Sequence, residues 1–311
     1  LYFSCILFTY TDFPMPKNEL LIIDGTALLF KMYFAKFNQL SRTGVEVGGV
    51  IGASRAVTRL ISEHDCQYVA VVFDAGQRTF RNDIYEAYKG HRPPAPPDLI
   101  PQFDLVIEAI EHLGCATFKK MGYEADDLIA TFVDKAHSIN LPVTMVTDDK
   151  DVSGLVRDTA PHCQQWLYSK KMMLQSGDVF EKFGVYPSKM VDYLALLGDA
   201  SDNVPGVKGV GKKSAAQLLN HFTDLEAMYD SLDEVLDLKI RGSASVKRKL
   251  EEGKETAELA KKLITLRKDV PMDTVDWAAL EFKGARDDAY PFFYDLGATY
   301  FLNWLQEYMD N

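Results

Sequence analysis

Nine acidic residues stand where carboxylates could hold metal ions. Two of them end short apolar runs, three open a helical pattern, and four form two close pairs. They are Asp24, Asp74, Glu124, Asp126, Asp127, Asp149, Asp151, Asp199 and Asp202. Taken singly, each group has a plainer explanation. The EADD segment at 124–127 could cap a helix and complement its dipole, and the close pairs could be turn residues.

Together, these acids indicate chemistry, because carboxylates crowded at one place raise one another's pKa values unless cations compensate them. The ligands would be hard oxygen atoms, with no Cys or His among them. Such a set favours Mg²⁺, with Mn²⁺ able to substitute, over zinc. Two such ions about 4 Å apart form the clamp used for in-line phosphodiester hydrolysis.

The elements that must position these acids alternate between strands and helices. Apolar runs at 19–24, 68–74 and 142–147 predict buried strands, and helical spacing extends from residue 25 to about Leu40 and over 98–113 and 124–140. This order predicts an α/β fold with a mostly parallel sheet flanked by helices. In such sheets ligands bind at the carboxyl ends of the strands. Asp24, Asp74 and Asp149 fall at or just past such ends.

The strand pattern stops at about Phe180, so we place a domain boundary near Gly177. Residues 17–177 are expected to form a nuclease-like unit, and residues 178–311 a helical one. The segment 273–311 is assigned as packing helices. Residues 1–16 are left unassigned.

The composition is that of an ordinary soluble protein, with 47% hydrophobic and 25% charged residues. No apolar run reaches the ~18 residues of a membrane helix. The four cysteines, Cys5, Cys66, Cys115 and Cys163, are dispersed, which argues against a disulfide framework or zinc site and suits a reducing compartment. We therefore expect an intracellular protein, in a prokaryotic cytoplasm or a DNA-containing organelle.

A net charge of −11 opposes contact with nucleic acid, but removing the nine acids leaves about −2. Residues 204–223 contain three lysines and no acid. The sign of the charge on the contacting surface, rather than the net charge of the chain, decides binding to phosphates.

The motifs IIDGT, VVFDAG, YKGHRPP, GYEADD, VTDDKD and LLGDASDNVPGVKGVGKKSA, in this order, resemble the 5′-nuclease family. This family includes the 5′→3′ exonuclease domain of bacterial DNA polymerase I and the flap endonucleases. The likeness extends from Glu19 to about Leu266. It implies a PIN-like core followed by a helix–three-turn–helix region, in a monomer that cleaves DNA at a 5′ end or 5′ flap, RNA primer–DNA junctions included. The implied setting is primer and flap removal in replication and repair.

The resemblance also divides the acids between two Mg²⁺ ions. Asp127 is set apart, orienting ligands or metal-bound waters. The first ion would be held by Asp24, Asp74, Glu124 and Asp126, and the second by Asp149, Asp151, Asp199 and Asp202.

A basic and aromatic stretch at about 77–100 resembles the helical arch of this family, through which a single-stranded 5′ end passes. Lys89 and Arg92 would contact the scissile phosphate, with Arg81 on the same stretch. Tyr85 or Tyr88 would stack a base. The plainer alternative is an amphipathic surface helix.

The glycine-rich segment at 206–215 resembles the hairpin that grips duplex phosphates without reading bases. Its proposed DNA-binding residues are Lys208, Gly209, Gly211, Lys212 and Lys213. A helix is expected to begin at Lys212 or nearby. The resemblance also implies a K⁺ ion held by backbone carbonyls of the hairpin. A helix C-cap followed by a new helix is the plainer alternative.

Two positions depart from the family pattern. Lys31 stands where the family commonly has Arg; it keeps the charge of a catalytic phosphate contact but loses the bidentate fork. Asp148 stands where Gly or Ala is frequent, which adds an acid beside the metal site.

Two other functions remain open on the sequence. A PIN-type ribonuclease would share the acids at the strand ends but has no reason for the arch or the hairpin. A non-catalytic DNA-structure binder would share both DNA-binding elements but has no reason to keep an acid at every ligand position.

Overall fold

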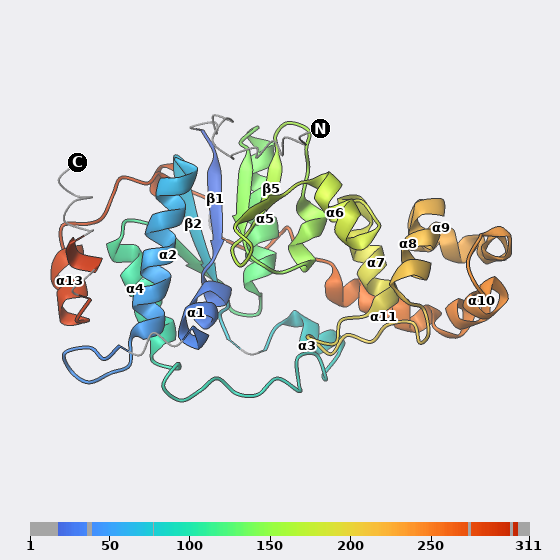
Figure 1. Ribbon diagram of the computed structural model, residues 1–311, viewed down its shortest axis with the longest axis horizontal. Coiled ribbons are helices and arrows are strands. Elements are labelled where there is room, and N and C mark those ends of the chain that lie inside the picture. The colour runs from blue at the N-terminus through green and yellow to red at the C-terminus, as the bar shows by residue number, and fades with distance from the viewer. Residues whose placement is uncertain (1–17, 36–38, 77, 273–274, 299–300, 304–311) are drawn as a thin grey trace, which may run out of the picture.

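The computed structural model describes residues 18–35, 39–76, 78–272, 275–298 and 301–303. The unassigned segment 1–16 lies outside these residues. Figure 1 shows a broad unit containing a sheet, from which a smaller helical unit projects. Within the described ranges, no helix is both long and apolar enough to cross a membrane.

A single sheet forms the centre of the broad unit, in the order β3-β2-β1-β4-β5-β6. All neighbours pair in parallel except β5 and β6. The strands are β1 (Leu20–Asp24), β2 (Tyr68–Phe73), β3 (Ala116–Lys119), β4 (Val143–Val146), β5 (Cys163–Leu167) and β6 (Met172–Leu174). The predicted strands at 19–24, 68–74 and 142–147 are confirmed as β1, β2 and β4. The predicted α/β fold with a mostly parallel sheet is confirmed as well.

Helices cover both faces of this sheet. In the first part of the chain they are α1 (Gly25–Phe34), α2 (Gly48–His64), α3 (Phe80–Ile84), α4 (Gln102–His112), α5 (Ala125–Ser138) and the 3-10 helix η1 (Asp151–Leu155). The helix expected to reach about Leu40 ends at Phe34, and Leu40 instead bridges to Glu46.

The remaining helices carry the chain outward and then back. They are α6 (Ser176–Phe183), η2 (Pro187–Lys189), α7 (Met190–Leu197), α8 (Lys212–His221), α9 (Leu225–Asp230), η3 (Leu232–Asp237), α10 (Ser243–Glu252), α11 (Lys254–Ile264), α12 (Trp277–Leu280) and α13 (Ala289–Asp295). Of these, α8, α9 and α10 form the projecting part in Figure 1.

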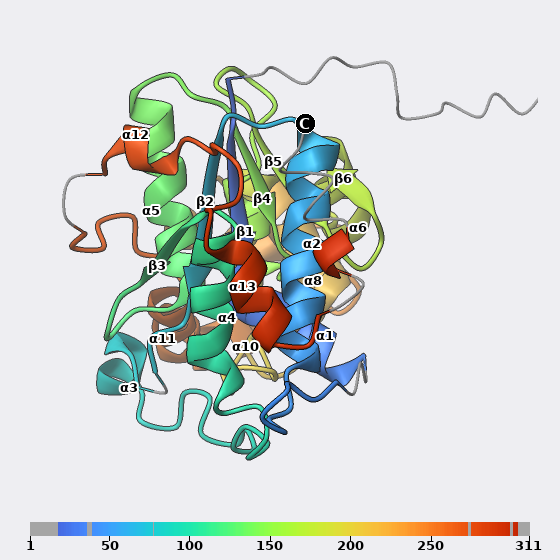
Figure 2. The ribbon, with the colours of Figure 1, turned by 90° about the vertical axis from the view of Figure 1, so that its left-hand side faces the viewer.

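Successive side chains of β1 point to opposite faces of the sheet, as strand geometry requires. Leu21 and Ile23 pack with α1, α2, α4 and α13, whereas Leu20 and Ile22 pack with α5. Figure 2 shows α2, α4 and α13 on one side of the sheet and α5 on the other.

The end of the described chain belongs to the broad unit. Phe293, Phe301 and Leu302 are buried in the same core as Leu21 and Ile23. The segment before α13 also joins the sheet region, because the Phe282 backbone N–H donates to Gln67 O at 2.9 Å. The prediction that all of 178–311 belongs to the second domain is therefore corrected. The helices predicted to pack there instead pack on the first domain, the unit that contains the sheet.

Candidate active site

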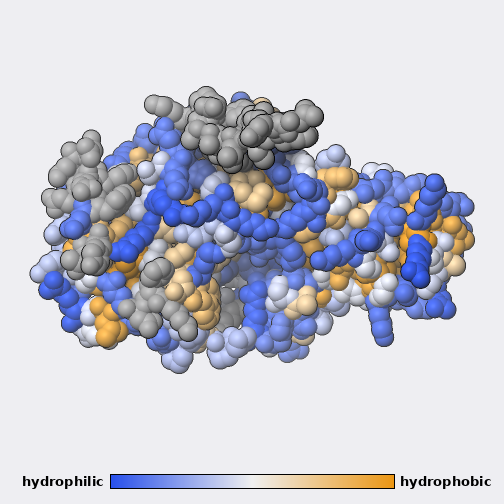
Figure 3. Space-filling model, in the orientation of Figure 1, coloured by the Kyte–Doolittle hydropathy of each residue, from blue (hydrophilic) through white to orange (hydrophobic). Residues whose placement is uncertain are grey.

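An open cleft lies at the carboxyl ends of β1 and β4, where the fold predicts a ligand site. Its volume is about 490 Å³, and its lining carries both acids and lysines. The lining residues are Asp24, Ala27, Thr147, Asp148, Asp149, Lys150, Lys182, Phe183 and Ser201. Figure 3 shows a hollow near the middle of this face, with hydrophilic residues around it.

Backbone and hydroxyl donors fix the acids at the ends of β1 and β2. Asp24 caps α1 by accepting the Ala27 N–H at 2.9 Å, and its other oxygen accepts the Thr147 hydroxyl at 3.1 Å. Asp74 accepts the Ala125 N–H at 2.9 Å, which ties β2 to the start of α5. The strand ends and the first turn of α5 therefore position these carboxylates together.

The three acids at the start of α5 take different directions. Glu124 is the N-cap, and its carboxylate meets Tyr88 and Lys89. Asp126 is half-buried and lies close enough to Asp149 and Asp24 to feel their charges. Asp127 is fully buried, and both of its oxygens are bonded to other groups. Asp127 therefore has a structural role and stabilises the fold beside the cluster.

Arg81 is the partner of Asp127, and its predicted place on the substrate-facing stretch is corrected. The residue is buried, with 1% of its surface exposed. The guanidinium makes two parallel bonds to Asp127 at 2.7 and 2.8 Å and a third to Leu263 O at 2.7 Å. The Arg267 N–H also reaches Asp127 at 2.9 Å. Because Leu263 lies in α11 and Arg267 comes shortly after it, this buried pair joins the sheet unit to the helical unit.

The later acids form a second group beside the first. Ligand oxygens of Asp151, Asp199 and Asp202 all lie within 4.8 Å of one another. Lys150 is inserted among them, pairing with Asp199 at 2.5 Å and with Asp151 at 3.1 Å. Asp151 Oδ1 is buried, and Lys150 Nζ is its close cationic neighbour among the described residues.

Burial and mutual repulsion raise the pKa values of three acids of the cluster. Burial raises the pKa of Asp24 to about 7, with repulsion from Asp74 adding to it. Burial followed by repulsion from Asp149 raises the pKa of Asp151 to about 7. The same causes place the pKa of Asp126 well above its usual value.

This arrangement fits divalent cations. The ligand set is oxygen-only, and its buried members repel one another. A dication would relieve that repulsion, and oxygen ligands suit it.

Within the described part of the segment predicted as a helical arch, only α3 is helical. From Tyr85 to Pro101 the chain runs through turns and coil, since the prolines of RPPAPP supply no backbone donors and disfavour a helix. Lys89 pairs with Glu124 at 2.9 Å and Asp202 at 3.5 Å, and Arg92 with Asp202 at 2.5 Å. These cations lie against the proposed metal ligands.

Tyr88 differs from its prediction as a base-stacking residue. Its ring is buried, at 4% exposure, and its hydroxyl lies 3.0 Å from Glu124 and 2.9 Å from Asp202. The phenol therefore spans an acid of the first proposed set and an acid of the second. Tyr85 is half-buried and packs against the core.

The glycine-rich hairpin lies between α7 and α8. The expected helix start at Lys212 is confirmed, and Gly211 is its N-cap. Lys208, Lys212 and Lys213 are all exposed. Gly209 has a φ of +82° and offers its carbonyl to Lys249 at 3.3 Å. A Cβ at Gly206 would lie 2.1 Å from Leu197 O, so the return of the hairpin onto α7 requires glycine there.

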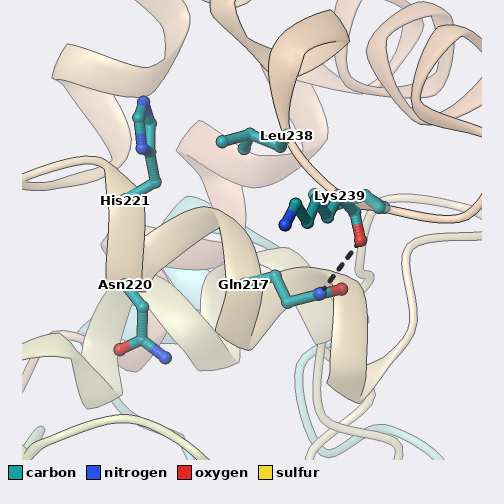
Figure 4. Close-up of a pocket in the computed structure, with 6 residues that line it drawn as sticks. Gln217, Asn220, His221, Leu238 and Lys239 are labelled. Carbon is teal, nitrogen blue, oxygen red and sulfur yellow. Dashed lines mark hydrogen bonds between the residues drawn. The ribbon is translucent and has the colours of Figure 1, made fainter.

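A separate pocket lies on the other side of α8, away from the carboxylates. Figure 4 shows Gln217, Asn220 and His221 on one wall and Leu238 and Lys239 on the other. Gln217 donates to Lys239 O at 3.3 Å. With no acid in its lining, this pocket is not part of the carboxylate cluster.

Sequence reasoning missed several residues that hold the cluster in place. Lys150 pairs with two acids of the second group, and the Ser201 backbone and hydroxyl both donate to Asp199. Thr26 accepts the Asp74 N–H at 2.8 Å, and Thr147 binds Asp24. Lys150 and Ser201 lie within the acidic motifs TDDKD and GDASDN. Their position inside these motifs could have identified them as partners of the acids.

The two departures from the family pattern contact each other. Lys31 pairs with Asp148 at 3.2 Å and also binds the Ser169 hydroxyl. Asp148 accepts the Ser169 N–H at 2.9 Å as well.

Comparison with known proteins identifies the family of this chain. Residues 19–184 match the family model "5'-3' exonuclease, N-terminal resolvase-like domain", and residues 185–288 match "5'-3' exonuclease, C-terminal SAM fold". The 5′-3′ exonuclease of Buchnera aphidicola is 30% identical over 260 residues, which cover 83% of this chain and 89% of that protein. DNA polymerase I of Bacillus subtilis is 32% identical over 94% of this chain.

The chain spans 25–32% of the length of such polymerase relatives. Among solved structures, the bacteriophage T5 flap endonuclease in complex with DNA and metal ions has the same fold. Its TM-score is 0.65 at 19% identity, and the match covers 94% of this chain and all of that one. The two adjoining family matches and the identity to a full-length relative place this chain in the 5′-3′ exonuclease family.

Proposed function

We propose that this chain hydrolyses DNA phosphodiester bonds at or near a 5′ end, as a 5′→3′ exonuclease and a 5′-flap endonuclease. The observation that carries the proposal is the gathering of carboxylates from separate segments at one edge of the sheet. Ligand oxygens of Asp151, Asp199 and Asp202 lie within 4.8 Å of one another, and Asp24, Asp74, Asp126 and Asp149 are close enough to repel one another. A family relative of similar length is named a 5′-3′ exonuclease. The T5 enzyme of the same fold is titled a flap endonuclease.

The eight carboxylates would hold two Mg²⁺ ions, for which Mn²⁺ could substitute. One set is Asp24, Asp74, Glu124 and Asp126, and the other is Asp149, Asp151, Asp199 and Asp202. When bound, such a pair of ions activates water and stabilises the attacking and leaving oxygens of an in-line displacement. Asp127 and Arg81 stabilise the start of α5, and through it the direction of the Glu124 and Asp126 side chains.

Lys89 and Arg92 would exchange partners when substrate enters. Both now pair with proposed metal ligands, Glu124 and Asp202. Metal ions would take over those carboxylates, and the two cations would then be free for the phosphate to be cleaved. Charge developing on that phosphate would be stabilised by groups already at the cleft.

The hairpin would grip the duplex beside the cleavage point. Its three exposed lysines suit phosphates, and its turn carbonyls suit a K⁺ ion. Such contacts fix register without reading sequence. The substrates would include RNA primer–DNA junctions, in replication and repair within a prokaryotic cytoplasm or a DNA-containing organelle. A monomer suffices for this arrangement.

The test is cleavage of a 5′-labelled flap duplex with Mg²⁺, resolving product lengths. Short products released near the flap junction are expected with metal, and none with EDTA or with Asp126→Asn or Asp149→Asn. Full activity of purified Asp149→Asn would overturn the metal assignment. Faster cleavage of single-stranded RNA of equal length would indicate a ribonuclease instead. Tight flap binding without any cleavage would indicate a structural DNA binder.

A further inference from the structure

A second group of cations gathers at the cleft, apart from Lys89 and Arg92. The β5–β6 turn follows the carboxyl end of β5, so it lies at the same edge of the sheet as the acids. This turn carries Ser169 and Lys170, both exposed. Lys31 reaches it from α1, and Lys182 lines the cleft from the end of α6.

These groups are held around one carboxylate. Asp148 accepts bonds from the Ser169 backbone and hydroxyl and pairs with Lys31 at 3.2 Å. Lys182 lies over the Phe183 ring, 4.7 Å from its centroid. Its ammonium group also interacts electrostatically with Asp148 and Lys170. Among the described residues, neither Lys170 nor Lys182 has a carboxylate within ion-pair distance.

The local charge therefore differs from that of the rest of the cleft. Lys89, Arg92 and Lys150 are each paired with acids of the metal cluster. Around Asp148, three ammonium groups face a single carboxylate, which leaves two positive charges in excess. Burial and the neighbouring Lys170 lower the pKa of Lys182, so an anion at this place would relieve it.

We propose that Lys31, Ser169, Lys170 and Lys182 form a second binding surface for nucleic-acid phosphates, here called the basic rim. The rim would hold the backbone of a strand that leaves the cleft past the β5–β6 turn. The polar groups of the rim are three ammonium groups and one hydroxyl, with no base-reading amide among them, and such groups suit a phosphodiester backbone rather than base edges. The inference rests on the proposed function, because it takes a nucleic acid as the ligand.

The experiment measures the salt dependence of binding to a fluorescent flap duplex, with Ca²⁺ in place of Mg²⁺ and the DNA checked for integrity. Lys170→Gln/Lys182→Gln is compared with Lys135→Gln/Lys268→Gln. The control pair removes the same charge at the other end of α5, beside His137. Thermal unfolding of each variant shows whether it is folded, and single Lys170→Gln, at an exposed turn, is the fallback.

The slope of log affinity against log salt is expected to become shallower by about 1.5 in the rim variant and to stay unchanged in the control. This follows from ~0.7–0.9 per lost phosphate contact. Equal slopes and equal Kd values for the rim and control variants would overturn the rim. Cleavage by the unsubstituted chain in Mg²⁺ is scored separately. Binding without cleavage would reject the proposed activity while the rim stands, and absence of binding would reject both.

Discussion

Lys31 and Asp148 are 117 residues apart in the chain, yet the Lys31 ammonium lies 3.2 Å from Asp148 Oδ2. The two positions where the sequence departs from the family pattern are therefore one ion pair. Asp148 is directed to Lys31 and Ser169, and these partners hold its pKa below the usual value. The extra acid is thus neutralised locally and adds little repulsion to the metal cluster.

Replacing Asp148 by Asn should free Lys31. The pair is about one-third exposed on each side, at 34% and 39%, so its loss should change the free energy of unfolding by less than about 1 kcal/mol. Flap binding should become tighter, with a salt slope steeper by at most about 0.9, because Lys31 no longer divides its charge between Asp148 and a phosphate. Anisotropy titrations at several salt concentrations measure this. The gain should vanish in Lys31→Gln/Asp148→Asn, and its persistence there would show that Lys31 is not the group released.

Removing the Arg81 side chain should mainly lower the free energy of unfolding, rather than act directly on catalysis. Asp127 would be left buried and unpaired, which typically costs about 3–5 kcal/mol. Urea unfolding of Arg81→Ala against the unsubstituted chain measures the loss. Arg81→Lys keeps the charge but not the fork, so it should fall between the two. A loss below about 1 kcal/mol for Arg81→Ala would contradict the structural role assigned to this pair.

The metal-free protein should become less stable as pH rises from about 4 to about 7. Asp24 and Asp151 have raised pKa values of about 7, so the folded chain binds their protons more tightly than the unfolded chain does. The free energy of unfolding therefore falls through this window and levels off above it. Urea midpoints in EDTA at a series of pH values check this. The decline should be smaller in Asp24→Asn, and Mg²⁺ should restore stability at pH 8. A curve that rises between pH 4 and 7 would contradict the repulsion described here.

Tyr88→Phe should weaken metal binding while leaving the fold intact. The phenol touches Glu124 and Asp202, one acid from each proposed set, and its ring remains in the variant. Loss of such an outer partner typically costs 10–100-fold in metal affinity or activity. Mg²⁺-dependent thermal shifts and flap cleavage over a range of Mg²⁺ concentrations measure it. If Tyr88 acted only by stacking a base, the Mg²⁺ dependence would stay unchanged and the affinity for DNA would still be that of the parent, because Phe stacks as well.

The central strands could be predicted because burial on both faces leaves a continuous apolar run. LLIID and YVAVVF are such runs, and the acid after each marks the ligand edge. The peripheral strands β3, β5 and β6 were not predicted from the sequence. In β5 the polar Gln165 is buried because it binds Ser153, Thr147 O and Asp149 O, so its sequence does not read as a buried strand.

The site was predictable in its members but not in all of their directions. Spacing showed that the acids would converge. It could not show that Arg81 turns inward, because the reason is Asp127, 46 residues later. Nor could it show that Tyr88 is buried, since a tyrosine in a basic stretch predicts an exposed side chain. Contacts over long sequence separation decide both cases.

The return of α13 to the core of the first unit makes the nuclease unit discontinuous in sequence. The helical unit is consequently an insertion, joined by two covalent connections, one entering near α6 and one leaving after α11. The insertion is packed as well as tethered, because one hydrophobic core runs from β1 and α5 into α7, α8 and α11. The hairpin lysines are therefore held in a fixed direction from the carboxylates.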